Sequence, residues 1–250
     1  MNSHDIARGV IPPGIQMRDL TLRYGARTVF EQLNIDIRGG QFAAMLGASG
    51  VGKTSLLKII AGLAQPTAGT VTGSDGLPVQ GRVAYMGQKD LLYPWLTVRD
   101  NISLASRLRG EKPDREWAEE LTDRVGLGGY GDSLPAALSG GMRQRAALAR
   151  TLYQRQPMVL MDEPFSALDA ITRTTIQTLA STLLTGHTVL LITHDPLEAC
   201  RLSHQLLVLS AAGIDDSHQI AGLPPRAPDD RHLLQSQGEL LQQLSRAAGW

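Results

Sequence analysis

The chain has 250 residues, which suffices for one large domain or for a core domain with an inserted lobe. Hydrophobic residues make up 42% of it, so the composition excludes a largely disordered protein. Its 24 basic residues are balanced by 24 acidic ones, and we therefore expect no nucleic-acid partner and no bulk attraction to anionic lipid.

The sequence predicts a protein that stays in the cytosol. Cys200 is the only cysteine, which excludes a disulfide within the chain, and we expect it to be a small apolar side chain on a helix. No apolar run approaches the ~20 residues that a membrane-spanning helix needs. Residues 1–14 form a predicted leader that carries Asp5 and lacks the apolar stretch of a signal peptide. Any membrane contact is therefore expected to come through a partner.

The first part of the chain is predicted to form strands and one helix. Residues 15–37 contain two stretches in which apolar and polar residues alternate, the pattern of half-buried antiparallel strands. Residues 42–46 are a short apolar run, typical of a strand that is covered on both faces. A Gly-rich loop leads from it into a predicted helix over 53–61, and residues 82–86 form the next predicted strand.

The middle of the chain, from about 89 to 153, is predicted to be mostly helical. Apolar residues at helical spacing define three predicted helices, over 98–108, 115–125 and 141–152. Two further buried strands, over 158–161 and 188–192, are separated by a predicted helix over 170–184. Strands that alternate with helices imply a parallel α/β sheet, so we expect the helical block to be a lobe inserted into it.

The end of the chain is predicted to be an amphipathic helix that follows a Pro-rich turn near Pro224. Its apolar stripe consists of Leu233, Leu234, Leu240, Leu241 and Leu244. Gly238 lies within this stretch and weakens the helix. We expect the leucines to pack against the main domain; a surface for a partner is the alternative.

Residues 47–54 match the phosphate-binding pattern G-x-x-x-x-G-K-S/T at every fixed position. This phosphate loop consists of Gly47, Ala48, Ser49, Gly50, Val51, Gly52, Lys53 and Thr54, and Ser55 follows it. Glycines let backbone N–H groups turn inward around a phosphate, and the following helix adds the positive end of its dipole. Lys53 would pair with the β- and γ-phosphates, and the Thr54 hydroxyl would bind Mg²⁺. The alternative is a flexible turn.

The predicted strand over 158–161 runs directly into two acids, Asp162 and Glu163. Asp162 at the strand's end is placed to hold Mg²⁺ through a water, and Glu163 is placed to polarise the attacking water as a general base. An apolar run followed by two acids is also the pattern of an ordinary solvated strand end. The phosphate loop upstream favours the nucleotide site.

The segment over 138–142 resembles the LSGGQ signature of ABC (ATP-binding cassette) ATPases. It consists of Leu138, Ser139, Gly140, Gly141 and Met142, and Arg143, Gln144 and Arg145 follow it. Residues 164–169 are similar to the D-loop of this family, and 193–195 to its switch region with the H-loop histidine, here His194. Gln88 falls where the Q-loop glutamine belongs, and Tyr24 where the adenine-stacking aromatic belongs.

The resemblance covers about residues 15–210 and implies an ABC ATPase domain there, followed by a short helical tail over 211–250. The implied fold is α/β: a P-loop NTPase (RecA-like) core with an N-terminal antiparallel β subdomain. The α-helical subdomain over about 89–153 would be inserted in the nucleotide-binding core. The implied cofactors are ATP and Mg²⁺.

The resemblance also implies roles for individual residues. The catalytic set would be Glu163, His194, Gln88 and Lys53, and the metal-binding set Thr54, Gln88 and Asp162. Tyr24 would stack on adenine, and His194 would donate a hydrogen bond to a phosphate. In isolation, Tyr24 also fits a core position.

The signature residues would serve a second copy of the chain. In this family two cassettes clamp two ATP molecules head to tail, so that Ser139, Gly140, Gly141 and Met142 would contact the ATP of the partner subunit. A Ser-Gly-Gly turn alone fits an ordinary helix cap. Met142 departs from the family's common glutamine, and Gly87 stands where a bulky apolar residue is frequent.

The segment over 85–99 resembles cassettes of importers for nitrate, sulfonate, taurine and the thiamine pyrimidine precursor, with a weak lean to the last. This resemblance implies separate permease subunits, a substrate-binding protein and a peripheral position on the cytoplasmic face of the inner membrane. Four residues are expected to be exposed and to receive the permease, namely Leu91, Leu92, Tyr93 and Trp95. Ordinary core of the helical lobe is the alternative.

Four rival functions agree less well with the sequence. An ABC protein of DNA repair or chromosome structure would need long coiled coils before the signature, and a translation-factor type would need two cassettes in one chain. A simple P-loop kinase or GTPase would have no reason to contain the signature. A binding module without catalysis is opposed by the presence of both Glu163 and His194.

Overall fold

The structure of the protein, a computed structural model, describes residues 10–210, 213–216 and 220–247. Residues 1–9 of the predicted leader lie outside the described residues, and residues 10–14 contain no helix or strand. The described strands are β1 (Ile15–Tyr24), β2 (Arg27–Ile37), β3 (Phe42–Gly47), β4 (Ala68–Gly73), β5 (Val83–Met86), β6 (Met158–Asp162), β7 (Thr188–Ile192), β8 (Gln205–Ser210) and β9 (Gly213–Asp215). The described helices are α2 (Lys53–Ile60), α3 (Val98–Ile102), α4 (Leu104–Leu108), α5 (Arg115–Arg124), the 3₁₀ helix η1 (Pro135–Ala137), α6 (Gly140–Tyr153), α7 (Ala170–Leu183), α8 (Pro196–Leu202) and α9 (Arg231–Ala247).

A small antiparallel sheet with the strand order β2-β1-β4 begins the fold. β1 and β2 form a hairpin in which Tyr24 pairs with Arg27 and Ile15 with Ile37. Gly25 in the turn has a φ of 58°, which glycine adopts with little strain. The predicted antiparallel pair is confirmed. β4 was not predicted, because its sequence AGTVTG has two glycines and little apolar alternation.

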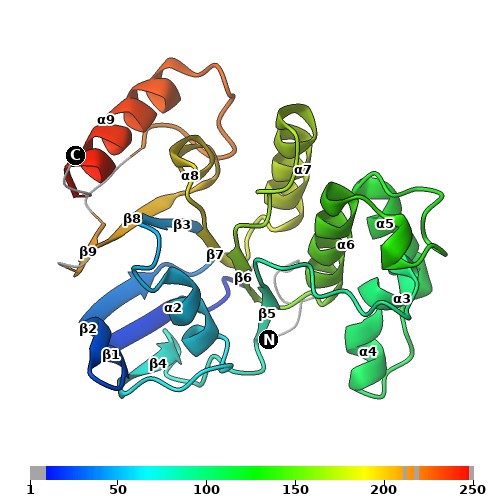
Figure 1. Ribbon diagram of the computed structural model, residues 1–250, viewed down its shortest axis with the longest axis horizontal. Coiled ribbons are helices and arrows are strands. Elements are labelled where there is room, and N and C mark those ends of the chain that lie inside the picture. The colour runs from blue at the N-terminus through cyan, green and yellow to red at the C-terminus, as the bar shows by residue number, and fades with distance from the viewer. Residues whose placement is uncertain (1–9, 211–212, 217–219, 248–250) are drawn as a thin grey trace.

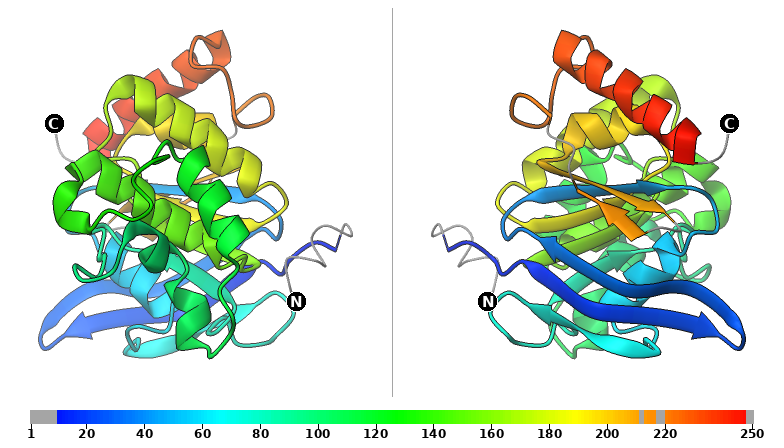
Figure 2. Two further views of the ribbon diagram at one scale, coloured as in Figure 1. Left: turned by 90° about the vertical axis from the view of Figure 1, so that its right-hand side faces the viewer. Right: turned by 90° about the vertical axis from the view of Figure 1, so that its left-hand side faces the viewer.

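The main sheet has the strand order β5-β6-β7-β3-β8-β9, and its strands are parallel except for β9. All residues of β6 and β7 are buried, as expected of parallel strands covered on both faces. In β3, Ala43 and Met45 enter the core shared with β1, β2 and α2, whereas Ala44 and Leu46 enter the core under α8 and α9. Figure 2 shows the antiparallel sheet on one side of the main sheet and α9 on the other.

Helices α3 to α6 fall between β5 and β6 in the chain and lie at one end of the molecule, coloured green in Figure 1. The prediction of one helix over 98–108 is wrong, because α3 ends at Ile102 and α4 begins at Leu104. Ser103 separates them, and its hydroxyl donates to the Arg99 carbonyl at 3.0 Å. A serine that bonds back to the carbonyl four residues earlier bends a helix.

Helices α8 and α9 cover the face of the main sheet that lies opposite the antiparallel sheet. Leu233 and Leu240 of α9 are buried against the core under α8, but Leu234 and Leu241 are 49% and 45% exposed, so the predicted stripe is only partly covered. Cys200 is buried on α8 as predicted. Arg226 attaches the segment before α9 to the end of α8, because its guanidinium donates to the carbonyls of Cys200 and Ser203 at 2.7 and 2.9 Å.

The architecture confirms the predicted α/β class, with an antiparallel sheet before the parallel one and a helical lobe between β5 and β6. Among the described residues, no helix combines the length and the apolar character that crossing a membrane requires.

Candidate functional site

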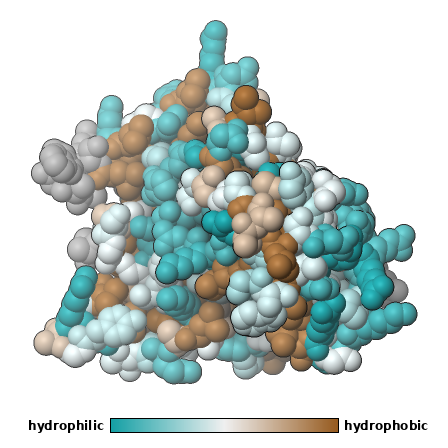
Figure 3. All heavy atoms as spheres, turned by 45° about the vertical axis from the view of Figure 1, so that its right-hand side comes forward, coloured by the Kyte–Doolittle hydropathy of each residue, from teal (hydrophilic) through white to brown (hydrophobic). Residues whose placement is uncertain are grey.

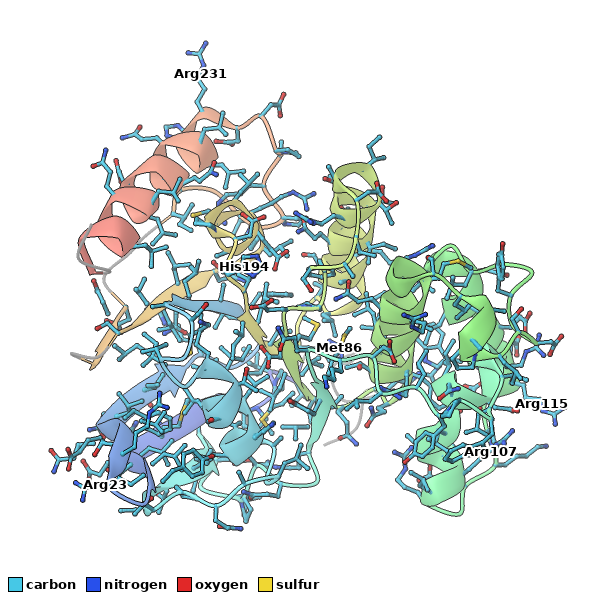
Figure 4. All side chains as sticks on the ribbon, in the orientation of Figure 1. Arg23, Met86, Arg107, Arg115, His194 and Arg231 are labelled. Atoms are coloured by element: carbon cyan, nitrogen blue, oxygen red, sulfur yellow. The ribbon has the colours of Figure 1, made fainter. Side chains whose placement is uncertain are left out.

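The carboxyl ends of three neighbouring strands bring the predicted acids and the histidine together. β5 pairs with β6 and β6 with β7, all in parallel, and Asp162 lies opposite Ile192. Gln88, Glu163 and His194 each come within two residues of a strand's last residue. Figure 4 labels His194 beyond β7 and Met86 at the end of β5. The carboxyl edge of a parallel sheet is the usual place for a ligand site in such folds.

The phosphate loop joins β3 to α2, and its glycines are required by its backbone. Gly50 and Gly52 have φ values of 78° and 108°, in the region that favours glycine. A Cβ atom at position 52 would also lie 2.6 Å from the Val29 Cγ1 atom. Gly52 provides no side-chain cap to α2, and no acidic residue occurs in the first turn. The N–H groups there are therefore available to an anion.

Lys53 is folded onto its own loop. Its Nζ atom donates to the carbonyls of Gly47 at 2.7 Å and of Ala48 at 2.9 Å. Burial lowers the pKa of Lys53, and the nearby carboxylates of Glu163 and Asp162 oppose that shift. The ammonium group thus lies in a partly desolvated position, where its attraction to an anion is stronger than in water.

Asp162 and Thr54 join the two predicted halves of the site. The Thr54 hydroxyl donates to the Asp162 Oδ2 atom at 2.7 Å. Burial raises the pKa of Asp162, whereas the hydrogen bond from Thr54 and the charge of Lys53 lower it. A buried carboxylate and a hydroxyl in contact are oxygen donors of the kind that Mg²⁺ prefers.

Glu163 has a strained backbone that its neighbours hold in place. Its φ is 49°, which is uncommon for a residue other than glycine. Its N–H donates to the Ile192 carbonyl at 2.8 Å. The Glu163 Oε2 atom lies 3.2 Å from the His194 Nδ1 atom, and the side chain of His194 is 66% exposed while that of Glu163 is 20% exposed. The sequence could not predict this contact.

A cleft of about 380 Å³ opens over Lys53, Thr54, Asp162 and Glu163, but His194 is not among the described residues that line it. It is lined by Tyr24, Arg27, Val29, Ser49, Gly50, Gly52, Lys53, Thr54, Ser55, Gln88, Asp162 and Glu163. Tyr24 is 60% exposed, so the alternative of a core position is wrong. Arg27 and Val29 were not predicted; they follow Tyr24 across the hairpin turn, which was the only signal for them.

The signature segment, residues 138–142, begins a different helix. Ser139 caps α6, and its hydroxyl oxygen accepts from the Met142 N–H at 3.2 Å. Ser139 and Gly140 are exposed. In the described part of the chain, residues 139–142 do not line the 380 Å³ cleft, and neither do Gly47, Ala48 and Val51. The structure thus separates the signature from the phosphate loop of the same chain.

The segment after Gln88 differs from expectation at one position. Leu91, Tyr93 and Trp95 are 62%, 42% and 71% exposed, as predicted, but Leu92 is buried at 8% because it belongs to the core of the helical lobe. The rings of Tyr93 and Trp95 meet edge to face, with centroids 5.4 Å apart. Figure 3 shows apolar side chains lying among polar ones on the face that includes this lobe.

The protein-family model described as ABC transporter matches residues 30–166. The chain is 41% identical over 240 residues to an uncharacterised ABC transporter ATP-binding protein of Haemophilus influenzae, covering 92% of this chain and 98% of the relative. It is 42% identical over 236 residues to the aliphatic sulfonates import ATP-binding protein SsuB 1 of Rhodococcus jostii, covering 94% of each. The SsuB 1 protein of Pseudomonas syringae is 41% identical over 228 residues, covering 90% of this chain and 93% of the relative.

Solved structures agree with the sequence relatives. A dimeric bacterial ABC transporter cassette superposes with a TM-score of 0.75 at 29% identity, covering 84% of this chain and all of that one. A dimeric ATP-binding cassette in a post-hydrolysis state, bound to ADP and Pi, gives a TM-score of 0.74 at 28% identity with the same coverage. The chain therefore belongs to the ABC transporter family, as one of its ATPase cassettes.

Proposed function

We propose that this chain is the ATP-hydrolysing subunit of an importer for a small solute and works as a head-to-tail dimer beneath separate permease subunits. The observation that carries the proposal is the convergence of Lys53, Thr54, Asp162 and Glu163 on one cleft. The first two come from the phosphate loop and the others from the end of β6, so that binding and hydrolysing groups face the same space. His194 contacts Glu163 from the next strand.

Each residue has a task that its surroundings support. The glycine-rich loop and the start of α2 would bind the phosphates, and Lys53 would exchange its loop carbonyls for phosphate oxygens. Tyr24 would offer its exposed ring to adenine. Glu163 would accept the proton of the attacking water, and His194, which lies beside the Glu163 carboxylate, would donate its N–H to the γ-phosphate.

The residues present fit a magnesium ion. Thr54 and Asp162 offer contacting oxygen atoms, and the Gln88 amide lines the same cleft, so these three residues would hold the ion. Bound Mg²⁺ neutralises negative charge on the phosphates during transfer.

The separation of the signature from the cleft supports the proposed dimer. Ser139 and Gly140 are exposed at the start of α6 and line no part of the chain's own described cleft, so we assign residues 139–142 to the ATP of a second copy. The dimeric form of both related solved cassettes supports this assignment.

The permease would dock on the exposed side chains of Leu91, Tyr93 and Trp95. This loop is held rigidly, because the buried Asn101 amide donates to the Tyr93 carbonyl at 3.1 Å and accepts from its N–H at 2.8 Å. Rigid aromatic groups that project from a fixed loop suit a protein interface. We place the complex at the cytoplasmic face of the inner membrane, with a substrate-binding protein outside.

The relatives named for aliphatic sulfonates favour a sulfonate, taurine included, among the solutes that the sequence indicated, over nitrate or the thiamine pyrimidine precursor. Purification with membranes tests this assignment. We expect a multi-span permease to co-purify and its vesicles to take up sulfonate with ATP; activity stimulated by DNA or ribosomes instead would favour a non-transport ABC ATPase.

The variant Glu163→Gln tests the proposed mechanism directly. Loss of the base should reduce ATP hydrolysis by about 100-fold or more while nucleotide binding remains. We expect saturating ATP and Mg²⁺ to trap this variant as a dimer in light scattering. Glu116→Gln, an exposed change on α5, is the matched control and should hydrolyse ATP like the parent. A Glu163→Gln protein that stays monomeric under these conditions contradicts the proposal.

A further inference from the structure

Gln144, on the second turn of α6, makes contacts that the proposed mechanism does not use. Its side chain is buried, with 6% of the residue exposed. Its Nε2 atom donates to the Glu163 carbonyl at 3.0 Å and to the Ser166 hydroxyl at 3.2 Å. Its Oε1 atom accepts from the Ala167 N–H at 2.8 Å. One amide therefore holds both sides of the turn that follows Glu163.

The contacts of Gln144 help to hold the strained backbone conformation of Glu163. Glu163 has a φ of 49°, and its N–H is already fixed by the Ile192 carbonyl of β7. Gln144 fixes the carbonyl of the same residue from the opposite element. A non-glycine residue stays in this region only when its surroundings determine it from several sides. The direction of the Glu163 carboxylate toward His194 depends on that backbone conformation.

The contacts also connect the signature segment to the base. Gln144 lies in the same helix that Ser139 caps, and Gly141 packs so closely that a Cβ atom there would lie 3.2 Å from the Ala167 carbonyl. The D-loop, residues 164–169, is thus held on α6 at Gly141 and at Gln144. A displacement of the start of α6 would be transmitted to the backbone of Glu163.

We propose that Gln144 is a positioning residue that ties the signature helix to the general base, so that Glu163 is aimed for hydrolysis only while α6 is seated against the D-loop. This inference rests on the proposed function, because it assigns Gln144 a task only if Glu163 acts in ATP hydrolysis. In the dimer, the same helix presents Ser139 to the nucleotide of the partner subunit. Gln144 therefore makes the base of one site responsive to the occupation of the other.

The test uses the full chain with two changes at this position. Gln144→Leu keeps a similar volume and removes all three hydrogen bonds, while Gln144→Glu keeps an acceptor for the Ala167 N–H and removes the donor to the Glu163 carbonyl. We expect either variant to lower kcat for ATP about 10- to 100-fold, as small misplacements of catalytic groups do. The KM for ATP and the affinity for ADP should stay within about twofold, because the phosphate loop is untouched.

Gln154→Leu is the matched control, since Gln154 lies at the end of the same helix and its amide reaches only the Arg150 carbonyl, at 3.5 Å. A double-variant cycle separates positioning from general damage. In single-turnover experiments, Gln144→Leu should slow hydrolysis far less in the Glu163→Gln background than in the parent, because the base it positions is already absent.

Three results overturn the inference: parental kcat in both variants, an equal loss in the two backgrounds, or a loss of ADP affinity that parallels the loss of kcat. If Gln144→Leu does not fold, the same comparison is made with Gln144→Glu and with Gln144→Met. Failure of the proposed function looks different, because the parent itself would then hydrolyse no ATP beside its membrane partner.

Discussion

The N-termini of α2 and α6 both resemble anion sites, yet they are built differently. α2 begins after Gly52, without a side-chain cap, and Lys53, Thr54, Asp162 and Glu163 surround the cleft above it. α6 begins after Ser139, whose hydroxyl satisfies the Met142 N–H at 3.2 Å. The first helix end has a lysine and two acids beside it, whereas the second offers a hydroxyl and two exposed or half-exposed glycines.

The difference indicates a division of labour. A helix start with a half-buried lysine and nearby carboxylates can both bind phosphate and perform hydrolysis. A helix start that is already capped can add hydrogen bonds to a phosphate that another chain supplies, but it has no base of its own. Changes at the start of α2 should therefore impair nucleotide binding, whereas changes at the start of α6 should impair hydrolysis.

Lys53→Ala should have the largest effect. It removes the cation from the cleft, and with it the charge-assisted hydrogen bonds that we propose Lys53 makes to phosphate, so we expect ATP affinity to fall about 100-fold. Lys58→Ala is the matched control, because Lys58 lies on the exposed side of α2. Fluorescent-nucleotide titration of the isolated chain measures both. Equal affinities for the two variants would remove the basis for calling α2 the nucleotide end.

Ser139→Ala should lower ATP hydrolysis about tenfold, since the variant would lose the hydrogen bond that we propose Ser139 makes to a phosphate at the partner's site. ATP affinity of the monomeric chain should not change, because Ser139 does not line the described cleft of its own chain. Thr97→Ala is the matched control, because the Thr97 hydroxyl caps α3 by accepting from the Asp100 N–H at 3.1 Å. This variant therefore loses a comparable helix cap, which contributes about 1 kcal/mol to stability. A Ser139→Ala protein with weakened binding as a monomer would contradict the division.

Tyr24→Ala should weaken ATP binding about tenfold, because the exposed ring has no counterpart at the start of α6 and base stacking contributes roughly 1–3 kcal/mol. Tyr24→Phe keeps the ring and should bind ATP like the parent, which separates stacking from hydrogen bonding by the hydroxyl. The affinities of each variant for ATP and for inorganic triphosphate, which lacks the adenine base, are then compared. A loss of triphosphate binding in Tyr24→Ala would show that the change disturbs the loop rather than the adenine contact.

The sequence predicted what depends on local pattern. The phosphate loop, the acids after β6 and the burial of β6 and β7 follow from motifs and short apolar runs, which carry their own structural context. β8, with the sequence QLLVLS, has the same apolar pattern and could have been found in the same way. Leu92 shows the limit, because whether one leucine in a loop is buried depends on the helices that pack over it.

The geometry around Glu163 could not be predicted, because it arises from residues far apart in the chain. The positive φ of Glu163, its contact with His194 and the amide of Gln144 require the register of β6 against β7 and the seating of α6. Periodicity does not report such contacts, since each side chain in isolation fits several environments. The break between α3 and α4 at Ser103 was partly predictable. Serine is common within helices, so its presence alone does not indicate a break; its hydrogen bond to the Arg99 carbonyl does.

The N-terminus of α8 provides a third case to compare with those of α2 and α6. A change there is expected to have the smallest effect on catalysis. Asp195 caps α8 by accepting from the N–H groups of Leu197 and Glu198, so this end supplies its own anion and is closed to phosphate. Glu198 follows in the first turn and is buried against α7, where the Gln177 amide donates to it at 3.0 Å. Burial raises the pKa of Glu198 to about 7, and the charge of Asp195 adds to the shift while Thr193, Gln177 and Arg173 oppose it.

The sign of the pH effect follows from that shift. Because the folded chain binds the Glu198 proton more tightly than the unfolded chain, this group contributes stability at low pH that is lost progressively as pH rises from the ordinary value of 4.5 through about 7. Glu198→Gln keeps an acceptor for Gln177 and removes the ionisation. We therefore expect the variant to gain stability over the parent at pH 8, on the order of 3 kcal/mol, and little at pH 4.5.

Denaturant unfolding at the two pH values measures this difference, with Glu116→Gln as the exposed control. ATP affinity at pH 7 should change less than twofold, since Glu198 does not line the described nucleotide cleft. A pH-independent gain would mean that Glu198 is ionised in the folded chain and that Arg173 and Gln177 stabilise its charge. If instead the variant binds ATP more weakly, the start of α8 takes part in nucleotide binding, and the contrast between a helix end closed by its own acids and one left open for phosphate fails.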